Sequence, residues 1–596
     1  MGRRKRDPEQ ALEEQVDEVE QRTATPSNPV EEDSVVDYSD KVYLTIEDLE
    51  LVRENEPIWR RLRIVLIVLF CVLWAGLVLG VVLTVVLSDR CPPRPTLSFW
   101  QSKVAYYLDP FAFSDSGSDW IGDLQGLRSS MGYLQETLGA GFVIMNSIMK
   151  GQYRVDRKSL GEVTDFKSVD PALGTMNDFR HMLKAFHKSG LEVVIALDFN
   201  GISQDHPWIN DTTHLKEYDE SLHWVSRNGK PPFMEHDGKK YYSVDNKLFD
   251  LQFGNEKILE MIIDVVKFWL QEGVDGILLK NCAFYVESDQ PTSSAARNIE
   301  NPWLAELPTA QLFQNGSVTV VQRVRKVLDD YSASKGREKV LIADPGDTGF
   351  GAQQLSTMIG SFLGTNKEPG AHLVVSRQFV TNSGSKEASM NTGQSSAHLV
   401  AYYNSSDEKT KSLALPTATD SDLIHNDLFL LVAVFLFPGT PVVYYGSELG
   451  NHYKITSDSP KEVYPMGKVP NTEQPPTEST LACQLPMPWS WSGDKFSAKG
   501  DDPDRFTRFL DSYGLTETME SVTAAARGSS YFSVVKKLVE LRQSPSMLWG
   551  NLEVIQTNEK SSGESFVAWT NSLGTVQKTP RTYTRRYKRE LNYQPT

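Results

Sequence analysis

The most continuous apolar stretch of the chain runs from Ile64 to Leu87 without a charged side chain. At about 1.5 Å per residue, a helix of this length measures roughly 36 Å, enough to cross a hydrocarbon core of about 30 Å. The stretch has no polar face and begins far from residue 1, which favours a single membrane span over a core helix or a cleaved signal peptide. Within it, Gly76 and Gly80 form a small-xxx-small step that permits close approach of another membrane helix, although such residues can also simply face lipid.

From Val104 onward, short apolar segments alternate with segments whose apolar residues recur at helical spacing. This alternation predicts an α/β fold, and its repetition along the chain favours a closed (β/α)8 TIM barrel over an open sheet. One predicted helix carries the stripe 179–186 and ends at Gly190, and another begins at Asn255 and ends at Gly273. The predicted strands are 142–145, 191–197, 276–279, 340–343, 399–403 and 442–445.

The same pattern predicts how the chain is divided. Residues 1–63 are polar and largely acidic, as expected of a cytoplasmic tail, and Thr45–Asp48 fits a capping box that opens a short helix. The transmembrane helix, 64–87, is followed by a neck, 88–103, and by the barrel, 104–548, with a polar and aromatic insert at 204–250. Residues 549–577 alternate like the start of a C-terminal β-domain, and 578–596 form a basic tail without a core-forming pattern, as in a variant or truncated product.

Composition and short motifs narrow the possible classes of function and the orientation of the chain across the membrane. The chain is 40% hydrophobic and 23% charged, and its net charge of −16 argues against nucleic acid as a partner. Basic residues flank both ends of the span, so they orient it only weakly. N-glycosylation sequons at Asn210, Asn315 and Asn404 all follow the span, which predicts a cytoplasmic N-terminus and an extracellular, glycosylated C-terminal part.

The chain has four cysteines. Cys71 lies in the predicted span, which leaves Cys91, Cys282 and Cys483 in an oxidising compartment. Because three is an odd number, at least one is expected to stay free or to bond to another chain. Cys91 is the most accessible candidate because it lies on the Pro-rich neck. Pairing of Cys91 with Cys483 within the chain is the alternative.

Several segments resemble the alpha-amylase superfamily of glycoside hydrolases. Gly122–Leu127 is similar to the family's segment after the first strand, and Val169–Phe179 to its signature before the second helix. Phe437–Gly450, at the eighth strand, is the most specific match, and Leu485–Trp489 follows at a similar distance. The resemblance covers about residues 104–549 and implies an amylase-type (β/α)8 barrel with a C-terminal β-domain, of which this chain shows only the beginning.

The single span and the juxtamembrane Cys91 narrow the resemblance to the heavy-chain subunits of heteromeric amino-acid transporters. The chain looks nearer the cell-surface-antigen type than the kidney type, which is more similar to the hydrolases at catalytic positions. The resemblance implies that Cys91 forms a disulfide with a multi-pass light chain and that the heavy chain supports its traffic to the plasma membrane and its amino-acid transport. It implies no cofactor and no metal, and adhesion receptors are a further candidate partner.

The residues at the family's nucleophile position argue against glycoside hydrolysis. Retaining glycosidases need two carboxyl groups about 5 to 5.5 Å apart, and the family's nucleophile ends a Gly-x-Arg-x-Asp step at the fourth strand. Here the step runs from Gly276, with Leu278 at the arginine and Lys280 at the nucleophile. A cation about 4 Å from a developing oxocarbenium ion replaces an attraction of roughly 4 kcal/mol with a comparable repulsion at an effective dielectric of about 20.

The other catalytic positions agree with this reading. Ala196 and Gly201 stand at the third-strand Asp and His, and Asp344 stands at the general-acid Glu, one methylene shorter. At the seventh strand, the glycosylation sequon of Asn404 replaces the Asn-His-Asp step. The resemblance therefore implies an inactive glycosidase homologue. Two other hypotheses stay open: a membrane-anchored alpha-glucosidase, and an adhesion or signalling glycoprotein that dimerises through the neck cysteine.

Overall fold

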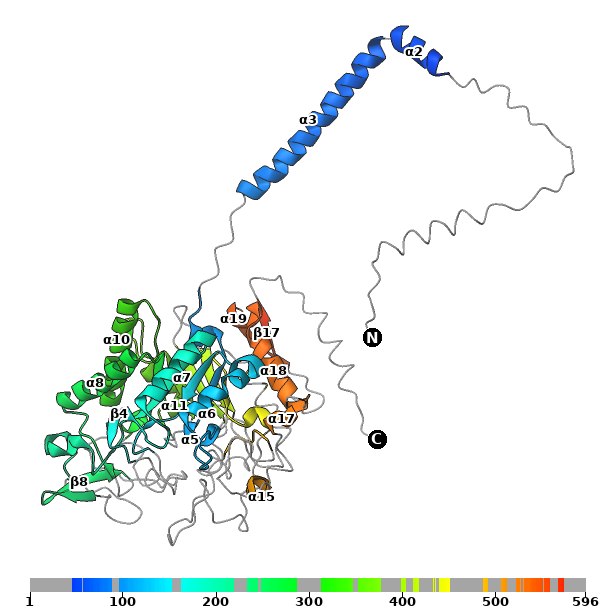
Figure 1. Ribbon diagram of the computed structural model, residues 1–596. Helices are drawn as coiled ribbons and strands as arrows, with labels where there is room; N and C mark the ends of the chain where they lie inside the picture. Colours follow the sequence, from blue (N-terminus) through cyan, green and yellow to red (C-terminus); the bar gives the residue numbers. More distant parts are fainter. Residues whose placement is uncertain are drawn as a thin grey trace, which may run out of the picture. The chain divides into compact units, whose positions relative to one another are not determined.

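The computed structural model describes most of the predicted span and barrel (Figure 1). The described residues are 45–55, 57–87, 96–152, 162–218, 233–244, 248–286, 312–346, 352–376, 398–403, 411–416, 432, 435, 439–450, 486–490, 505–511, 521–525, 527–528, 530–549, 551–557 and 566–572. Met1–Pro93 and Arg94–Thr596 are two compact units, and each is treated by itself. Of the predicted site residues, Cys91 and Asn404 lie outside the described residues, as does Cys483.

The first unit contains the helices α2 (Ile46–Asn55) and α3 (Pro57–Leu87). The predicted capping box is confirmed, because the Thr45 N–H donates to Asp48 Oδ2 at 3.1 Å and the Asp48 N–H to Thr45 Oγ1 at 3.3 Å. Helix α3 starts before the uncharged run, at a proline, which suits the first turn of a helix. Within the described part of the chain, Ile58–Leu87 is the one helix long and apolar enough to cross a membrane.

The second unit is built on a curled sheet of nine strands in the order β14-β13-β12-β11-β10-β5-β2-β1-β15. Its strands are β1 (Ala105–Leu108), β2 (Phe142–Met145), β5 (Glu192–Asp198), β10 (Gly276–Lys280), β11 (Val340–Ala343), β12 (Leu373–Ser376), β13 (His398–Tyr403), β14 (Lys411–Pro416) and β15 (Val442–Tyr444). The neighbours from β15 through β1 to β12 are all parallel. This is the predicted amylase-type barrel.

The seventh predicted strand, 399–403, was expected to run parallel to the others, and that expectation is wrong. Strand β13 pairs antiparallel with β12, and β14 pairs antiparallel with β13. A parallel neighbour needs a crossover connection, usually a helix. The connection between β12 and β13, residues 377–397, lies outside the described residues.

The strands separate two layers of apolar side chains. On β10, Leu278 faces the barrel interior, whereas Ile277 and Leu279 belong to the larger core between sheet and helices. Alternation of this kind follows from the two-residue period of a strand. In Figure 1, helices lie on both sides of the sheet. In chain order the helices of this unit are α4 (Phe99–Ser102), α5 (Pro110–Phe113), α6 (Leu124–Ser129), η1 (Tyr133–Leu138), α7 (Met176–Ser189), α8 (Glu256–Glu272), η4 (Cys282–Phe284), α10 (Asn315–Lys335), α11 (Ala352–Leu363), η7 (Ser447–Leu449), α15 (Arg505–Asp511), α17 (Val522–Ala525), α18 (Ser530–Arg542) and α19 (Pro545–Trp549).

The two helices predicted in most detail form as expected. The Thr175 side chain caps α7 by accepting from the Asp178 N–H, and Gly190 ends the helix with φ +84°. Asn255 caps α8, and Gly273 ends it with φ +107°. Both glycines occupy the left-handed region that other residues avoid.

Smaller sheets complete the unit. The hairpin β16 (Asn551–Thr557) and β17 (Phe566–Ser572) is antiparallel and lies within the residues predicted to begin a C-terminal β-domain. Loop elements at the barrel rim include part of the predicted insert. They are β3 (Met149–Lys150), β4 (Asp165–Val169), β6 (Ile202–Ser203), η2 (Pro207–Asn210), η3 (Thr212–His214), β7 (Phe233–His236), β8 (Lys239–Val244) and β9 (Leu248–Phe249).

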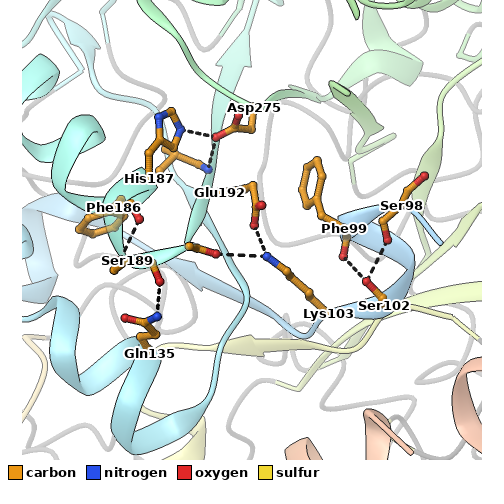
Figure 2. A network of polar contacts seen from close by, with 12 residues as sticks. Ser98, Phe99, Ser102, Lys103, Gln135, Phe186, His187, Ser189, Glu192 and Asp275 are labelled. Carbon is orange, nitrogen blue, oxygen red and sulfur yellow. Dashed lines mark hydrogen bonds and ion pairs between the residues drawn. The ribbon is translucent and has the colours of Figure 1, made fainter. Parts of the chain in front are cut away.

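The first described residues of the second unit are fastened to the amino ends of the strands. Trp100 is buried with the barrel-interior residues, and its carbonyl accepts a hydrogen bond from the Thr440 hydroxyl. Lys103 Nζ donates to the Gly190 carbonyl at 3.1 Å and to Glu192 Oε2 at 2.6 Å (Figure 2). The chain therefore enters the barrel at the end opposite to the carboxyl ends of the strands.

A buried carboxylate stabilises the same end of the barrel. Asp275, directly before β10, lies 2.6 Å from His187 Nε2 and accepts from the Val193 N–H at 3.0 Å (Figure 2). Lys339 Nζ lies 3.2 Å from its other oxygen and also donates to the Val274 carbonyl at 2.7 Å. Because these partners come from α7, β5 and the residue before β11, Asp275 joins three successive βα units.

Candidate functional site

Polar side chains gather where the barrel strands end at their carboxyl edge. Lys280 is the last residue of β10, and its Cα partner on the neighbouring strand is Asp198, the last residue of β5. Asp109, Asn146 and Asp344 each follow directly after a strand, namely β1, β2 and β11. Because these strands are parallel, their carboxyl ends meet at one edge, where βα barrels carry their active sites.

Direct contacts join several of these side chains. Lys280 Nζ donates to Asn146 Oδ1 at 3.1 Å, and the Tyr107 hydroxyl donates to the same oxygen at 3.3 Å. Asn281 Nδ2 donates to Asp198 Oδ2 at 2.6 Å. Lys280 is therefore hydrogen-bonded to the residue that follows β2, and Tyr107 of β1 binds the same amide oxygen.

The charges around Lys280 keep it protonated. Burial by itself lowers the pKa of Lys280, but the acidic side chains around it outweigh this effect and raise the pKa above its ordinary value. They are Tyr107, Asp198, Asp344 and Asp109, in decreasing order of effect. Burial raises the pKa of Asp198, against the opposing effect of the Lys280 ammonium. An ammonium ion has no lone pair, so Lys280 cannot act as a nucleophile.

The structure brings the predicted catalytic positions together at this edge. Ala196 and Leu278 are paired across β5 and β10, and both lie in the buried barrel interior, one step below Asp198 and Lys280. Asp344 is 8% exposed, and its Oδ1 accepts from the Gly346 N–H at 3.0 Å. Gly201 is buried just after β5.

Sequence reasoning missed Asp198, Asn146, Tyr107 and Asp109 in this cluster. A signal for Asp198 was present, because it follows Ala196 by two residues and a strand turns such residues to the same face. The other three residues could be assigned to this cluster only from the order of the strands in the sheet, which the sequence does not reveal. Among the described residues, no group of three or more His, Cys, Asp or Glu side chains is placed to hold a metal ion.

The membrane helix offers a second candidate site. An added Cβ at Gly76 or Gly80 would meet no atom of the described chain within 4 Å, so both glycines leave open space beside α3. Thr84, one turn after Gly80, donates its hydroxyl back to the Gly80 carbonyl at 2.9 Å. The residues 76, 80 and 84 therefore form a narrow strip of small side chains on one face, and sequence reasoning had missed its third member.

The described cysteines and sequons bear on the predicted disulfide and on the predicted glycosylation sites. Cys282 is a free, fully buried thiol whose pKa burial raises well above its ordinary value. It is therefore inert towards disulfide exchange in the folded chain. Asn210 ends η2 and Asn315 begins α10, and both are exposed.

Two family profiles match consecutive parts of the chain. Solute carrier family 3 member 2 N-terminus matches residues 36–106. Alpha amylase, catalytic domain, matches residues 107–343. The first match includes α2 and α3, and the second extends from β1 to the end of β11.

Individual relatives include both transporter subunits and glycosidases. The human amino acid transporter heavy chain SLC3A1 is 25% identical over 443 residues, which cover 69% of this chain and 60% of that protein. Maltase A2 of Drosophila melanogaster is 25% identical over 395 residues, 59% of this chain and 66% of that enzyme. The chain thus spans about 60% of the length of the human and mouse heavy chains that it matches.

Solved structures support the fold. The alpha-glucosyl transfer enzyme XgtA superposes with a TM-score of 0.58 at 18% identity, over 78% of this chain and 88% of the enzyme. This likeness confirms the amylase-type fold predicted from the sequence. The chain resembles the heavy-chain subunits of amino-acid transporters, with a solute carrier family 3 N-terminal segment followed by an alpha-amylase-like domain.

Proposed function

We propose that this chain is the non-catalytic heavy chain of a heteromeric amino-acid transporter. It is a single-pass type II glycoprotein of the plasma membrane, and the division into tail, span, neck, barrel and partial β-domain given above is part of the proposal. Cys91 forms a disulfide with a multi-pass light chain, and Gly76 and Gly80 pack against one of that chain's helices. The heavy chain supports the folding, surface delivery and amino-acid transport of its partner.

One observation carries the proposal: a protonated lysine stands in the middle of the polar cluster at the carboxyl ends of the barrel strands. The family's nucleophile position aligns with Lys280, which is hydrogen-bonded to Asn146 and surrounded by carboxylates. A retaining glycosidase needs a carboxylate there to attack the sugar. With that chemistry absent, the membrane helix and the neck remain as the parts that carry function.

A membrane-anchored alpha-glucosidase is the second candidate, because Maltase A2 is also similar to this chain. Under that hypothesis Asp344 and Asp198 would have to supply the acid and the nucleophile. The Asp198 carboxylate is already bound by the Asn281 amide at 2.6 Å, beside the Lys280 ammonium. Hydrolysis of a maltose analogue by the purified full chain would favour this candidate over the first.

Co-expression with a multi-pass amino-acid transporter tests the proposal through the neck cysteine. We expect Cys91→Ser to remove the covalent complex on non-reducing gels while part of the surface transport persists. The disulfide raises the effective concentration of the partner, and helix packing alone retains weaker association. The measurements are gel mobility, surface biotinylation of the transporter and amino-acid uptake.

Cys483→Ser is the matched control, because Cys282 is buried and only Cys91 and Cys483 are left as exocytoplasmic partners for a disulfide. The control should leave the covalent complex intact. Loss of the complex in the Cys483 variant, with its retention in the Cys91 variant, would contradict the assigned linkage. A complex that contains two copies of this chain and no transporter would support the adhesion hypothesis instead.

Glycosylation gives an independent test of the proposed orientation. We expect glycans at Asn210, Asn315 and Asn404, and each substitution to glutamine should increase mobility on a gel by one glycan step. Treatment with peptide N-glycosidase F should collapse all variants to one mobility. If the enzyme leaves the mobility of the native chain unchanged, the C-terminal part does not pass through the secretory lumen, and the orientation is wrong.

A further inference from the structure

A buried carboxylic acid joins the last parallel strand of the barrel to the first. Glu448 lies in η7, which begins three residues after the end of β15, and its side chain is fully buried. The hydroxyls of Tyr106 and Tyr133 both donate to Glu448 Oε1, each at 2.7 Å. The other oxygen, Oε2, is also buried and has no hydrogen bond of standard geometry from the described residues, although the backbone N–H groups of Gly446 and Glu448 also favour the ionised carboxylate.

The three side chains come from different elements that meet beside the seam between β1 and β15. Tyr106 lies on β1, which is paired with β15 through Tyr106 and Val443. Tyr133 begins η1, the short helix that precedes β2. The hydrogen bonds of Glu448 therefore hold η7 against both β1 and η1. A change that weakens these hydrogen bonds would loosen the packing of the three elements.

No cation of the described residues faces Glu448. Its titratable neighbours are Tyr106 and Tyr133, and Tyr445 lies close to Tyr106. Helix α18 packs against η7 and η1 and buries apolar side chains, among them Phe532 and Val535. The charged residues of α18 point elsewhere: Lys536, Lys537 and Glu540 are exposed, and the Arg542 guanidinium donates to the Phe435 carbonyl at 3.1 Å.

We propose that Glu448, Tyr106 and Tyr133 form a pH-sensitive latch that closes more tightly when the protein enters an acidic compartment. A neutral carboxylic acid fits an entirely buried site that contains no cation, whereas an ionised carboxylate there loses its hydration without a compensating charge. The latch goes beyond the proposed transport function, because it concerns the barrel alone and does not depend on any partner.

The direction of the effect follows from linkage. Burial raises the pKa of Glu448 from 4.5 to about 7, although the hydrogen bonds from Tyr106 and Tyr133 oppose the shift. The folded chain thus binds the proton more tightly than the unfolded chain. The fold is therefore stabilised as the pH falls from about 7 towards 4.5, and the stabilisation is lost as the pH rises through about 7. Endosomal compartments, at about pH 5 to 6, lie within this window.

Thermal unfolding of the full chain in detergent micelles tests the latch. Tryptophan fluorescence follows the unfolding of the whole chain, and one of its twelve tryptophans, Trp489, has its ring 5.3 Å from the Tyr133 ring. Glu448→Gln keeps the shape and the acceptor for both tyrosines but carries no charge at any pH. We subtract the Tm of the native chain from the Tm of this variant at each pH. We expect this difference to be about 2 to 4 °C larger at pH 8 than at pH 5.5.

Two further variants make the result decisive. Glu260→Gln, at an exposed position of α8, should keep a constant Tm difference from the native chain at every pH. Tyr133→Phe removes one donor to the carboxylate, so the pH-dependent part of its Tm curve should move to higher pH. The proposal is overturned if the Glu448 and Glu260 variants show the same pH dependence. If Glu448→Gln does not fold, Tyr133→Phe alone decides the question. The proposal is then overturned if the curve of Tm against pH has the same midpoint in Tyr133→Phe as in the native chain.

Discussion

Replacing Lys280 by aspartate is expected to destabilise the protein and to produce no glycosidase activity. The substitution restores the residue type of the family's nucleophile, so a simple loss of that residue would predict a gain of activity. In this structure it instead places a fourth carboxylate beside Asp109, Asp198 and Asp344, the three carboxylates that surround the lysine, and removes their cation. Ala196 and Leu278 would still lack the polar groups that accompany the nucleophile in the family.

The expected size follows from the loss of a charge partner. Breaking a buried ion pair costs about 3 to 5 kcal/mol, and because Lys280 is partly exposed we expect about 2 to 4 kcal/mol. Thermal unfolding should show a fall in Tm of roughly 4 °C or more. A maltose-analogue assay should show no hydrolysis.

Lys280→Met is the matched control, because it removes the cation without adding an acid. Its Tm should lie between those of the native chain and the aspartate variant. An aspartate variant as stable as the native chain would contradict the electrostatic role of Lys280. Measurable hydrolysis by that variant would show that the barrel retains the rest of a working active site.

Filling the small-residue strip on α3 is expected to weaken association with the partner without affecting the heavy chain itself. Gly76→Leu and Gly80→Leu add side chains where the described chain has no atom within 4 Å, so no internal clash arises. Leucine also favours a helix more than glycine does. Inserting bulk into a closely packed contact costs about 1 to 3 kcal/mol, so the double variant should lower the association constant by about five- to 150-fold.

Co-purification in the Cys91→Ser background measures this loss, because the disulfide can no longer mask it. Val78→Phe is the control: at about 100° per residue it lies roughly opposite Gly76 on the helix, and it also adds bulk. If Val78→Phe weakens association as much as the double variant, the strip is not the contact face. Unchanged association of the double variant leads to the same conclusion.

The sequence predicted the barrel well where local signals agree with the final structure. The strands 142–145 and 340–343 were placed at their observed bounds, because continuous apolar runs between turn residues leave little choice. The caps at Asn255 and Gly273 were found because they act through short-range hydrogen bonds and backbone conformation. Strand direction is a different kind of property: β13 was recognised as a strand, but the residues within it carry no signal for its antiparallel pairing with β12.

In the candidate site, too, residues within local motifs were predicted, whereas contacts between distant residues were not. Lys280 and Asp344 were found by position within short motifs, and the structure places both at the carboxyl edge of the sheet. The contact of Lys280 with Asn146 joins residues far apart in sequence, so no local pattern could indicate it. Glu448 lies within the most specific sequence match, but only burial and its tyrosine partners distinguish it from an ordinary surface glutamate.

Purification of the native protein from membranes, followed by gel analysis with and without dithiothreitol, tests the central claim most directly. The account predicts one disulfide-linked complex that the reductant separates into this chain and a multi-pass amino-acid transporter, identified by mass spectrometry. Recovery of this chain only as a monomer or as a homodimer, with no transporter attached, would contradict it.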